Sequence, residues 1–281
     1  MRTVEAKVIT AAIAKLCIDA NYYLSPDVYD ALVAGKEKEE SPLGREILGQ
    51  LVDNACIARN QAMPICQDTG MAVVFMEIGQ DVHITGGDLE AAVNAGVVQG
   101  YKEGYLRKSV VNDPMFVRKN TGDNTPAILH LSIVPGDKIK ITIAPKGFGS
   151  ENMSAVKMLT PSAGVAGVKK FVTDTVTAAG SNPCPPMVVG VGIGGTFEKA
   201  AFLAKKALLR PINKHNADPM YAKLEEELLE LVNKTGVGPQ GLGGTITALG
   251  VNVEYYPTHI AGMPVAININ CHATRHAEIE I

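Results

Sequence analysis

The 281-residue sequence lacks three features: a long apolar run, an excess of basic residues and a paired cysteine spacing. The longest charge-free stretch of the N-terminal segment runs from Val8 to Ala14, which is too short to span a bilayer and carries no signal-peptide cleavage pattern. Lys and Arg number 26 against 29 Asp and Glu, so no basic field is available to hold a nucleic-acid backbone. We therefore expect a cytoplasmic protein with no membrane or nucleic-acid partner.

The composition excludes intrinsic disorder and a disulfide framework. Apolar residues make up 46% of the chain and charged residues 20%, which is ordinary for a folded globular protein. Five cysteines, an odd and sparse set, favour a reducing compartment. Because no repeat, low-complexity tract or linker interrupts the chain, we expect a single domain over residues 1–281.

Helical patterns dominate the first 62 residues, where Ser25-Pro26 and Ser41-Pro42 each read as a cap followed by a helix start. After this portion, strand-like and helix-like segments alternate. The predicted fold is therefore mixed α/β, with small mixed sheets flanked by helices and a helical N-terminal portion. The segments after the first 62 residues are strands near 71–78, 127–134, 139–143, 187–193, 245–255 and 264–270, and helices near 88–106, 160–180, 196–209 and 218–236.

Two of these segments carry more specific expectations. Pro135-Gly136-Asp137 is a turn sequence between the strands near 127–134 and 139–143, which predicts an antiparallel hairpin. The helix near 218–236 is expected to expose a charged face that carries Glu225, Glu226 and Glu230.

The cysteines divide into two groups by context. Cys17 and Cys56 lie among apolar neighbours in helical patterns, which is typical of core positions. Cys66, Cys184 and Cys271 instead stand at strand ends, where sites are usually built. These three could share a metal, but their separations match neither zinc-finger nor ferredoxin spacing. Three unrelated small residues remain the alternative.

Three glycines form a literal G-x-G-x-x-G: Gly190, Gly192 and Gly195 follow a predicted strand and precede a predicted helix. The pattern suggests a dinucleotide site, which needs an acidic residue at the end of a second strand about 20 residues later. The nearest acidic residue, Asp218, begins a helix instead. We therefore favour close backbone packing near a ligand or cluster, with an NAD-binding oxidoreductase as the alternative.

Other candidate residues lie in loops and at element ends. The loop from Lys146 to Asn152 gathers flexible backbone N–H groups that could hold a small anion or form a plain surface turn. Arg107 is expected at a helix end, and His259 and His272 flank the last long strand.

Together, six motifs resemble those of the iron–sulfur-dependent hydro-lyases, a family that comprises class I fumarases and L(+)-tartrate dehydratases. The closest similarity is to the alpha subunit of the two-subunit forms, and it covers roughly Thr3 to Ile281. The motifs, in matching order, are PICQDTG, KGFGSENMS, SNPCPP, VGIGGTFEKA, THIAGMPVA and NINCHATR.

The resemblance implies a [4Fe–4S] cluster held by Cys66, Cys184 and Cys271, with one iron open to substrate. It implies further that Gln67, Asp68, Arg107, Gly149 and His259 contact a dicarboxylate substrate, with Asp68 and His259 as catalytic residues. The loop KGFGSEN departs from the family pattern, because Phe148 stands where three successive glycines are expected.

The implied activity is reversible hydration of fumarate to (S)-malate, a reaction of the tricarboxylic acid cycle, with dehydration of L(+)-tartrate to oxaloacetate as the alternative. Because single-chain members continue into a second domain beyond the last cluster cysteine, a separate beta subunit is expected to complete the site and supply the base. We expect an alpha–alpha dimer within a heterotetramer. The alpha chain without its partner is expected to be inactive. A noncatalytic cluster-binding protein is the remaining alternative.

Overall fold

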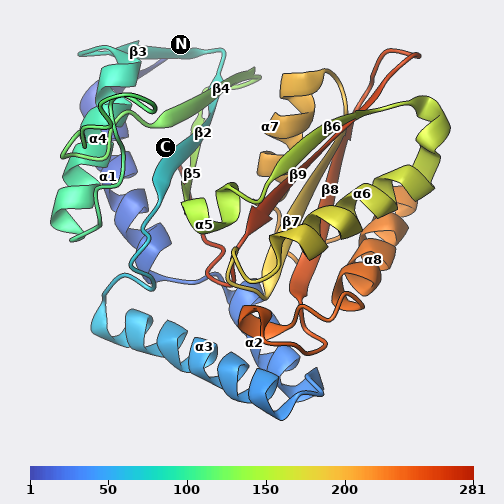
Figure 1. Cartoon of the computed structure of the whole chain (residues 1–281). Helices are drawn as coiled ribbons and strands as arrows, with labels where there is room; N and C mark the ends of the chain where they lie inside the picture. The colour runs from blue at the N-terminus through green and yellow to red at the C-terminus, as the bar shows by residue number, and fades with distance from the viewer. The chain divides into compact units, whose positions relative to one another are not determined.

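The computed structural model describes all 281 residues, which form two compact units (Figure 1). Unit 1 contains Met1–Leu24, Ala55–Phe148 and Arg275–Ile281, and unit 2 contains Ser25–Asn54 and Gly149–Thr274. The single domain expected over residues 1–281 stays a prediction. No helix combines the length and apolar character needed to cross a membrane.

The N-terminal portion contains three helices, and the second and third begin where the two Ser-Pro pairs predict. They are α1 (Ala6–Tyr22), α2 (Pro26–Lys38) and α3 (Pro42–Gln61). Ser41 caps α3 as expected, because its Oγ accepts the Gly44 N–H at 3.2 Å. The Ser25 side chain makes no such bond, so the start of α2 depends on Pro26 at its first position.

Unit 1 contains a four-stranded mixed sheet in the order β10-β5-β2-β4. Helices α1 and α4 pack together, and their apolar side chains share one buried core with the sheet. A short parallel pair, β1 with β3, adjoins them. The elements are β1 (Arg2–Glu5), β2 (Met71–Gly79), β3 (Val82–Thr85), α4 (Leu89–Glu103), β4 (Ile128–Val134), β5 (Ile139–Lys146) and β10 (Ala277–Glu280).

The predicted hairpin of β4 and β5 is wrong, because β2 lies between them. β2 pairs in parallel with β4 and antiparallel with β5. The connection from β4 to β5 crosses the end of β2, where Gly79 N–H donates to the Lys138 carbonyl at 2.8 Å. A Cβ on Gly79 would lie 2.3 Å from the Gly136 carbonyl oxygen, so only glycine allows this crossing.

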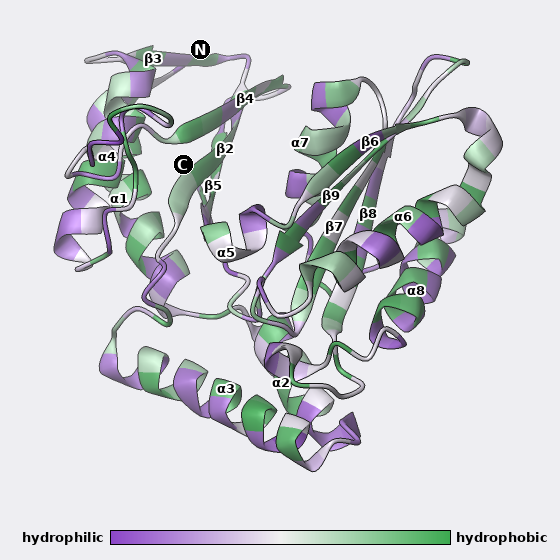
Figure 2. Ribbon diagram, in the orientation of Figure 1, coloured by the Kyte–Doolittle hydropathy of each residue, from purple (hydrophilic) through white to green (hydrophobic).

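Unit 2 contains a second mixed sheet, in the order β6-β9-β7-β8. Helices α6 and α8 cover one face, and α7 packs against the other (Figure 1). Figure 2 shows the strands as largely hydrophobic and the flanking helices as mixed, the pattern of a sheet buried between amphipathic helices. The elements are α5 (Phe148–Glu151), β6 (Ala155–Leu159), the 3₁₀ turn Pro161–Ala163, α6 (Gly164–Ala179), β7 (Met187–Gly194), α7 (Phe197–Ala207), α8 (Pro219–Asn233), the 3₁₀ turn Pro239–Gly241, β8 (Ala248–Tyr256) and β9 (Met263–Asn270).

Two glycines of the G-x-G-x-x-G pattern bring β7 close to α7. A Cβ on Gly190 would lie 2.1 Å from the Ala204 carbonyl oxygen, and one on Gly192 would lie 2.1 Å from that of Ala200. The expectation of close backbone packing is confirmed, with a helix as the neighbour. No strand follows α7 before α8, so the second strand of a dinucleotide-binding unit is missing.

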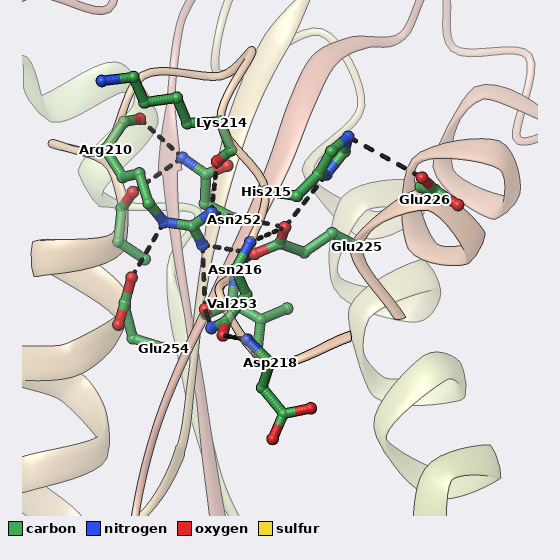
Figure 3. A network of polar contacts seen from close by, with 11 residues as sticks. Arg210, Lys214, His215, Asn216, Asp218, Glu225, Glu226, Asn252, Val253 and Glu254 are labelled. Carbon is green, nitrogen blue, oxygen red and sulfur yellow. Dashed lines mark hydrogen bonds and ion pairs between the residues drawn. The ribbon is translucent and has the colours of Figure 1, made fainter. Parts of the chain in front are cut away.

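Glu225 is buried rather than exposed, which corrects the charged face expected for α8. It is 2% exposed and accepts the Val253 N–H at 2.7 Å and the Asn216 N–H at 2.9 Å, and it pairs with Arg210 (Figure 3). These contacts fold the segment between α7 and α8 onto β8. A buried carboxylate with this many donors has a structural role.

Glu39 is the second buried carboxylate of unit 2, and it holds a loop. Although burial alone would raise the pKa of Glu39, the N–H donors of Ser41, Thr245 and Ile246 outweigh it and keep the pKa below its ordinary value. Because the folded-state pKa is the lower one, the stabilisation is present above the ordinary pKa and is lost as the pH falls through the folded-state pKa.

We predict that Glu39→Gln lowers the free energy of unfolding at neutral pH by about 1–3 kcal/mol, because an amide NH₂ then faces backbone donors. The deficit relative to the wild type should shrink at acid pH, as the pH falls through the lowered folded-state pKa and the wild-type carboxylate also becomes protonated. Urea unfolding at both pH values measures it, with the exposed Glu37→Gln as control. A deficit that persists unchanged in acid would contradict this role.

Candidate functional site

In unit 1, the motif PICQDTG forms the loop between α3 and β2, and Asp68 organises it. Its Oδ1 accepts the Gly70 N–H at 3.1 Å and its Oδ2 accepts the Phe148 N–H at 3.0 Å. The half-buried carboxylate therefore joins this loop to the start of the KGFGSEN loop. With both oxygens occupied by backbone donors, Asp68 acts first as a positioning group.

Arg107 is held beside this loop through its backbone. The α4 helix ends at Glu103, so Arg107 lies four residues beyond it and not at the helix end as expected. Its carbonyl accepts the hydroxyl of Thr69 at 3.1 Å, while its side chain is exposed. A guanidinium that extends into solvent from a fixed backbone is well suited to bind a carboxylate.

Tyr101 binds the backbone of the PICQDTG loop through its hydroxyl group. Its fully buried hydroxyl lies within hydrogen-bonding distance of the carbonyls of Thr69, at 2.8 Å, and Gly70, at 3.0 Å. Burial raises the pKa of Tyr101 above its ordinary value, so the hydroxyl remains a donor at neutral pH.

Sequence reasoning missed Arg275, although it ends the NINCHATR motif. The side chain is 4% exposed, and its Nη2 donates to the Asp68 carbonyl. Its Nε and Nη1 are buried without a hydrogen-bond partner. A buried, permanently charged guanidinium under the Asp68 loop makes this part of unit 1 electropositive.

In unit 2, the structure brings Cys184 and Cys271 together. The N–H of His272 donates to the Cys184 carbonyl at 3.2 Å, which joins the two cysteine loops through the backbone. Gln240 anchors the same region, because its side-chain amide donates to the Pro185 carbonyl at 2.7 Å. Cys184 has a φ of 54°, a left-handed conformation that is uncommon outside glycine and is often found at functional sites.

The third predicted ligand, Cys66, belongs to unit 1, and its Sγ lies 3.5 Å from the Gln67 side-chain oxygen. No group of three His, Cys, Asp or Glu side chains is arranged as a metal site. No disulfide joins any cysteine.

The thiol donors nevertheless fit an iron–sulfur cluster in exposure and chemistry. Cys66, Cys184 and Cys271 are partly or fully exposed on loops, and thiolates are the ligands such clusters use. By contrast, burial raises the pKa of Cys17 to about 12, which keeps this thiol protonated and inert.

Gly149 lies at the cysteine end of unit 2. A Cβ built on it would lie 3.3 Å from the Asn182 carbonyl oxygen, in the turn that precedes Cys184. Phe148, the departure from the glycine pattern, donates its N–H to Asp68 and keeps a half-exposed ring. The Phe148 N–H is therefore engaged within the protein, and the substrate contact expected of Gly149 stays a prediction.

A polar cluster, missed in the sequence, fixes the Gly149 turn to β9 and α7. Glu151 pairs with Lys205 at 2.5 Å and accepts the Asn268 amide at 2.8 Å. Asn268 also donates to Ser154 at 3.0 Å. The cluster borders a cavity of about 210 Å³ between β6, β9 and α7. No local pattern identifies such a cluster, since its members are distant in sequence.

The structure does not bring His259 to the cysteines within unit 2. His259 lies in the turn between β8 and β9, whereas Cys271 follows the opposite end of β9. The eight residues of β9 rise about 3.3 Å each, so about 25 Å separate the two ends. His259 instead borders an open cavity of about 460 Å³ with Lys199, Tyr256 and the start of α7.

Comparison with known proteins identifies the family. The model for fumarate hydratase (fumerase) matches residues 10–280, almost the whole chain. The chain belongs to the fumerase family. A Methanocaldococcus jannaschii protein, provisionally named L(+)-tartrate dehydratase subunit alpha, is 43% identical over 274 residues, which cover 96% of each chain.

Bacterial members of the fumerase family are also similar. The L(+)-tartrate dehydratase subunit alpha of Escherichia coli K12 is 33% identical over 273 residues, which cover 96% of this chain and 90% of that protein. The same subunit from strain UTI89 is 33% identical over 275 residues. The resemblance inferred from the six motifs is therefore confirmed.

We predict that the Glu151–Lys205 pair contributes a coupling free energy of about 1–2 kcal/mol, because both side chains are mostly buried. A double-mutant cycle of Glu151→Ala and Lys205→Ala, read by urea unfolding, measures it. The exposed pair Lys170–Asp174 is the matched control and should give at most about 0.5 kcal/mol. Equal coupling in the two cycles would show that the Glu151 cluster does not fix the turn.

Proposed function

We propose that the chain is the alpha subunit of a [4Fe–4S]-dependent hydro-lyase that dehydrates L(+)-tartrate. The observation that carries the proposal is the near full-length match to relatives named L(+)-tartrate dehydratase subunit alpha, at 33–43% identity. The motifs favour fumarate hydratase, with L(+)-tartrate dehydratase as the alternative, and these relatives support the alternative better. Fumarate hydratase stays the second candidate, because the matching family carries that description.

In this proposal, Cys66, Cys184 and Cys271 hold the cluster. The adjacency of Cys184 and Cys271 in unit 2 and the exposure of all three thiols support the assignment. A cluster with three thiolate ligands keeps one iron open, where it acts as a Lewis acid on the substrate hydroxyl and carboxylate. The buried guanidinium of Arg275 supplies positive charge near a loop that would face an anionic cluster and a dianionic substrate.

The residues that we propose to bind or orient the substrate have different roles. Arg107 binds one carboxylate of the substrate through its exposed guanidinium fork. Gln67 and the backbone at Gly149 donate hydrogen bonds that orient the substrate. Asp68 fixes the conformation of the loop that carries Gln67, since its carboxylate already holds two backbone N–H groups of unit 1.

The proposed reaction removes a proton from one carbon of tartrate and hydroxide from its neighbour. The products are water and the enol form of oxaloacetate, which then becomes the keto acid. The imidazole beside Cys184 and Cys271 is that of His272, and its Nδ1 already lies 3.1 Å from the Cys184 carbonyl oxygen and 3.2 Å from the Gln240 side-chain nitrogen, so we give it a positioning role. We therefore assign the base to the beta subunit, and the relatives' names as subunit alpha support such a partner.

In this proposal, His259 acts at the site of a second copy of the chain. Because β9 separates it from Cys271 by about 25 Å within unit 2, a histidine from the same copy does not reach a substrate held at the cysteines. An alpha–alpha dimer within a heterotetramer would bring His259 of one copy to the site of the other. The compartment expected for the enzyme is the cytoplasm.

We predict that Cys66→Ser, Cys184→Ser and Cys271→Ser each abolish bound iron and sulfide after anaerobic reconstitution, and abolish turnover with the beta subunit. Each variant lacks one thiolate and so loses a cluster ligand. Cys56→Ser, outside the predicted set, is the control and should reconstitute like the wild type. Iron and sulfide analysis with visible absorption measures the result; full cluster content in all three variants would refute the ligand assignment.

We further predict that the reconstituted complex has a kcat/KM for L(+)-tartrate at least about tenfold above that for (S)-malate, and that the alpha chain alone is inactive. Formation of oxaloacetate and fumarate can be followed separately by their absorbance. A preference for malate would favour the fumarate hydratase candidate, and strong activity of the alpha chain alone would remove the need for a partner.

A further inference from the structure

Three consecutive large apolar side chains project into solvent from unit 1. Met115, Phe116 and Val117 are 73%, 83% and 75% exposed, and they lie in the segment between α4 and β4 (green in Figure 1). Single exposed apolar residues need no explanation, but a contiguous group of this size typically marks an interaction surface.

This apolar tip is held in one conformation by Asp113. Its carboxylate accepts the N–H groups of Met115 at 3.1 Å, Phe116 at 3.0 Å and Val117 at 2.5 Å. These backbone donors, with that of Val117 foremost, keep the pKa of Asp113 below its ordinary value. The tip is therefore organised before any partner arrives, which reduces the entropy lost on binding.

Paired backbone below the tip makes the segment 110–121 a small hairpin. Val111 and Asn120 form an antiparallel bridge, and Asn112 N–H donates to the Lys119 carbonyl at 2.9 Å. The Asn120 amide donates to the Lys108 carbonyl at 3.1 Å, which ties one arm to the other.

The base of the hairpin is joined to the Asp68 loop. Asn124, which is fully buried, accepts the Ser109 N–H at 2.7 Å and donates to the Gly70 carbonyl at 3.1 Å. Thr69 bonds the Arg107 carbonyl on the same side. Hydrogen bonds therefore connect the base of the hairpin to the loop that contains Cys66 and Asp68.

The charge of the hairpin indicates which kind of partner surface would bind it. Residues 110–121 include two basic side chains, Arg118 and Lys119, and one acidic residue, Asp113, whose carboxylate is occupied by the tip, and Arg107 and Lys108 add two basic side chains just before the hairpin. Two such hairpins placed against each other would bring like charges together, which disfavours symmetric self-association through the tip. The complementary surface is an apolar pocket rimmed by acidic side chains.

We infer that Met115, Phe116 and Val117, presented by this basic hairpin, dock into an acid-rimmed apolar pocket of the beta subunit. The inference rests on the proposed two-subunit enzyme and names the surface where the partner arrives. Docking there positions the partner beside Arg107, at the loop that it would complete.

The test measures the Kd between the purified alpha chain and the beta subunit by calorimetry. Phe116→Asp should weaken binding at least about 100-fold, as expected for a central apolar residue of an interface. Asp113→Ala, which loosens the tip without changing its apolar residues, should weaken it about fivefold. Lys119→Glu should weaken binding by a smaller factor than Phe116→Asp, and the loss should shrink at high salt.

Met220→Asp is the matched control, because Met220 is 82% exposed on α8 of unit 2 and should leave Kd unchanged. Circular dichroism and urea unfolding establish that each variant is folded. A wild-type Kd retained by Phe116→Asp overturns the inference but leaves the proposed function intact. Loss of an alpha–alpha dimer with unchanged beta binding overturns it in favour of a second copy, and an active enzyme that forms no complex overturns both proposals.

Discussion

The carboxylate of Asp68 is the constraint on which the unit 1 site depends. It holds the N–H of Gly70 on its own loop and the N–H of Phe148 at the start of the next, so two distant motifs share one geometry. The Thr69 hydroxyl of the same loop donates to the Arg107 carbonyl, and the buried Arg275 of the C-terminal segment donates to the Asp68 carbonyl. Hydrogen bonds from backbone N–H groups to an ionised carboxylate are shorter and stronger than those between neutral groups.

In unit 2 the strand β9 has the equivalent role. It pairs with β6 on one side and β7 on the other, and it ends directly before Cys271. The Glu151 cluster attaches the Gly149 turn to this same strand through Asn268. One buried strand thus sets the positions of Cys184, Cys271 and Gly149, and places His259 at its other end, which is the structural argument for a site shared between copies.

Much of the fold could be predicted from the sequence because helices are specified locally. Ser41-Pro42 and the cap Asp88 predicted α3 and α4 with small errors. Strand pairing depends on distant partners, so the β4–β5 hairpin was predicted wrongly and the short strand β6 was missed. The candidate cluster cysteines were predicted from motifs, whereas Glu151 and Arg275 were missed because their partners are separated from them by 54 and 207 residues. Burial of Glu225 likewise required a partner from outside its helix.

The most direct test of the account is the EPR spectrum of the reduced, anaerobically reconstituted alpha–beta complex, recorded with and without L(+)-tartrate. We expect a [4Fe–4S] signal that shifts when tartrate is added, because substrate would bind the one iron that lacks a thiolate. A cluster signal that no dicarboxylate perturbs would show that all four irons are ligated by protein. Failure of the complex to take up any cluster would contradict the central claim for Cys66, Cys184 and Cys271.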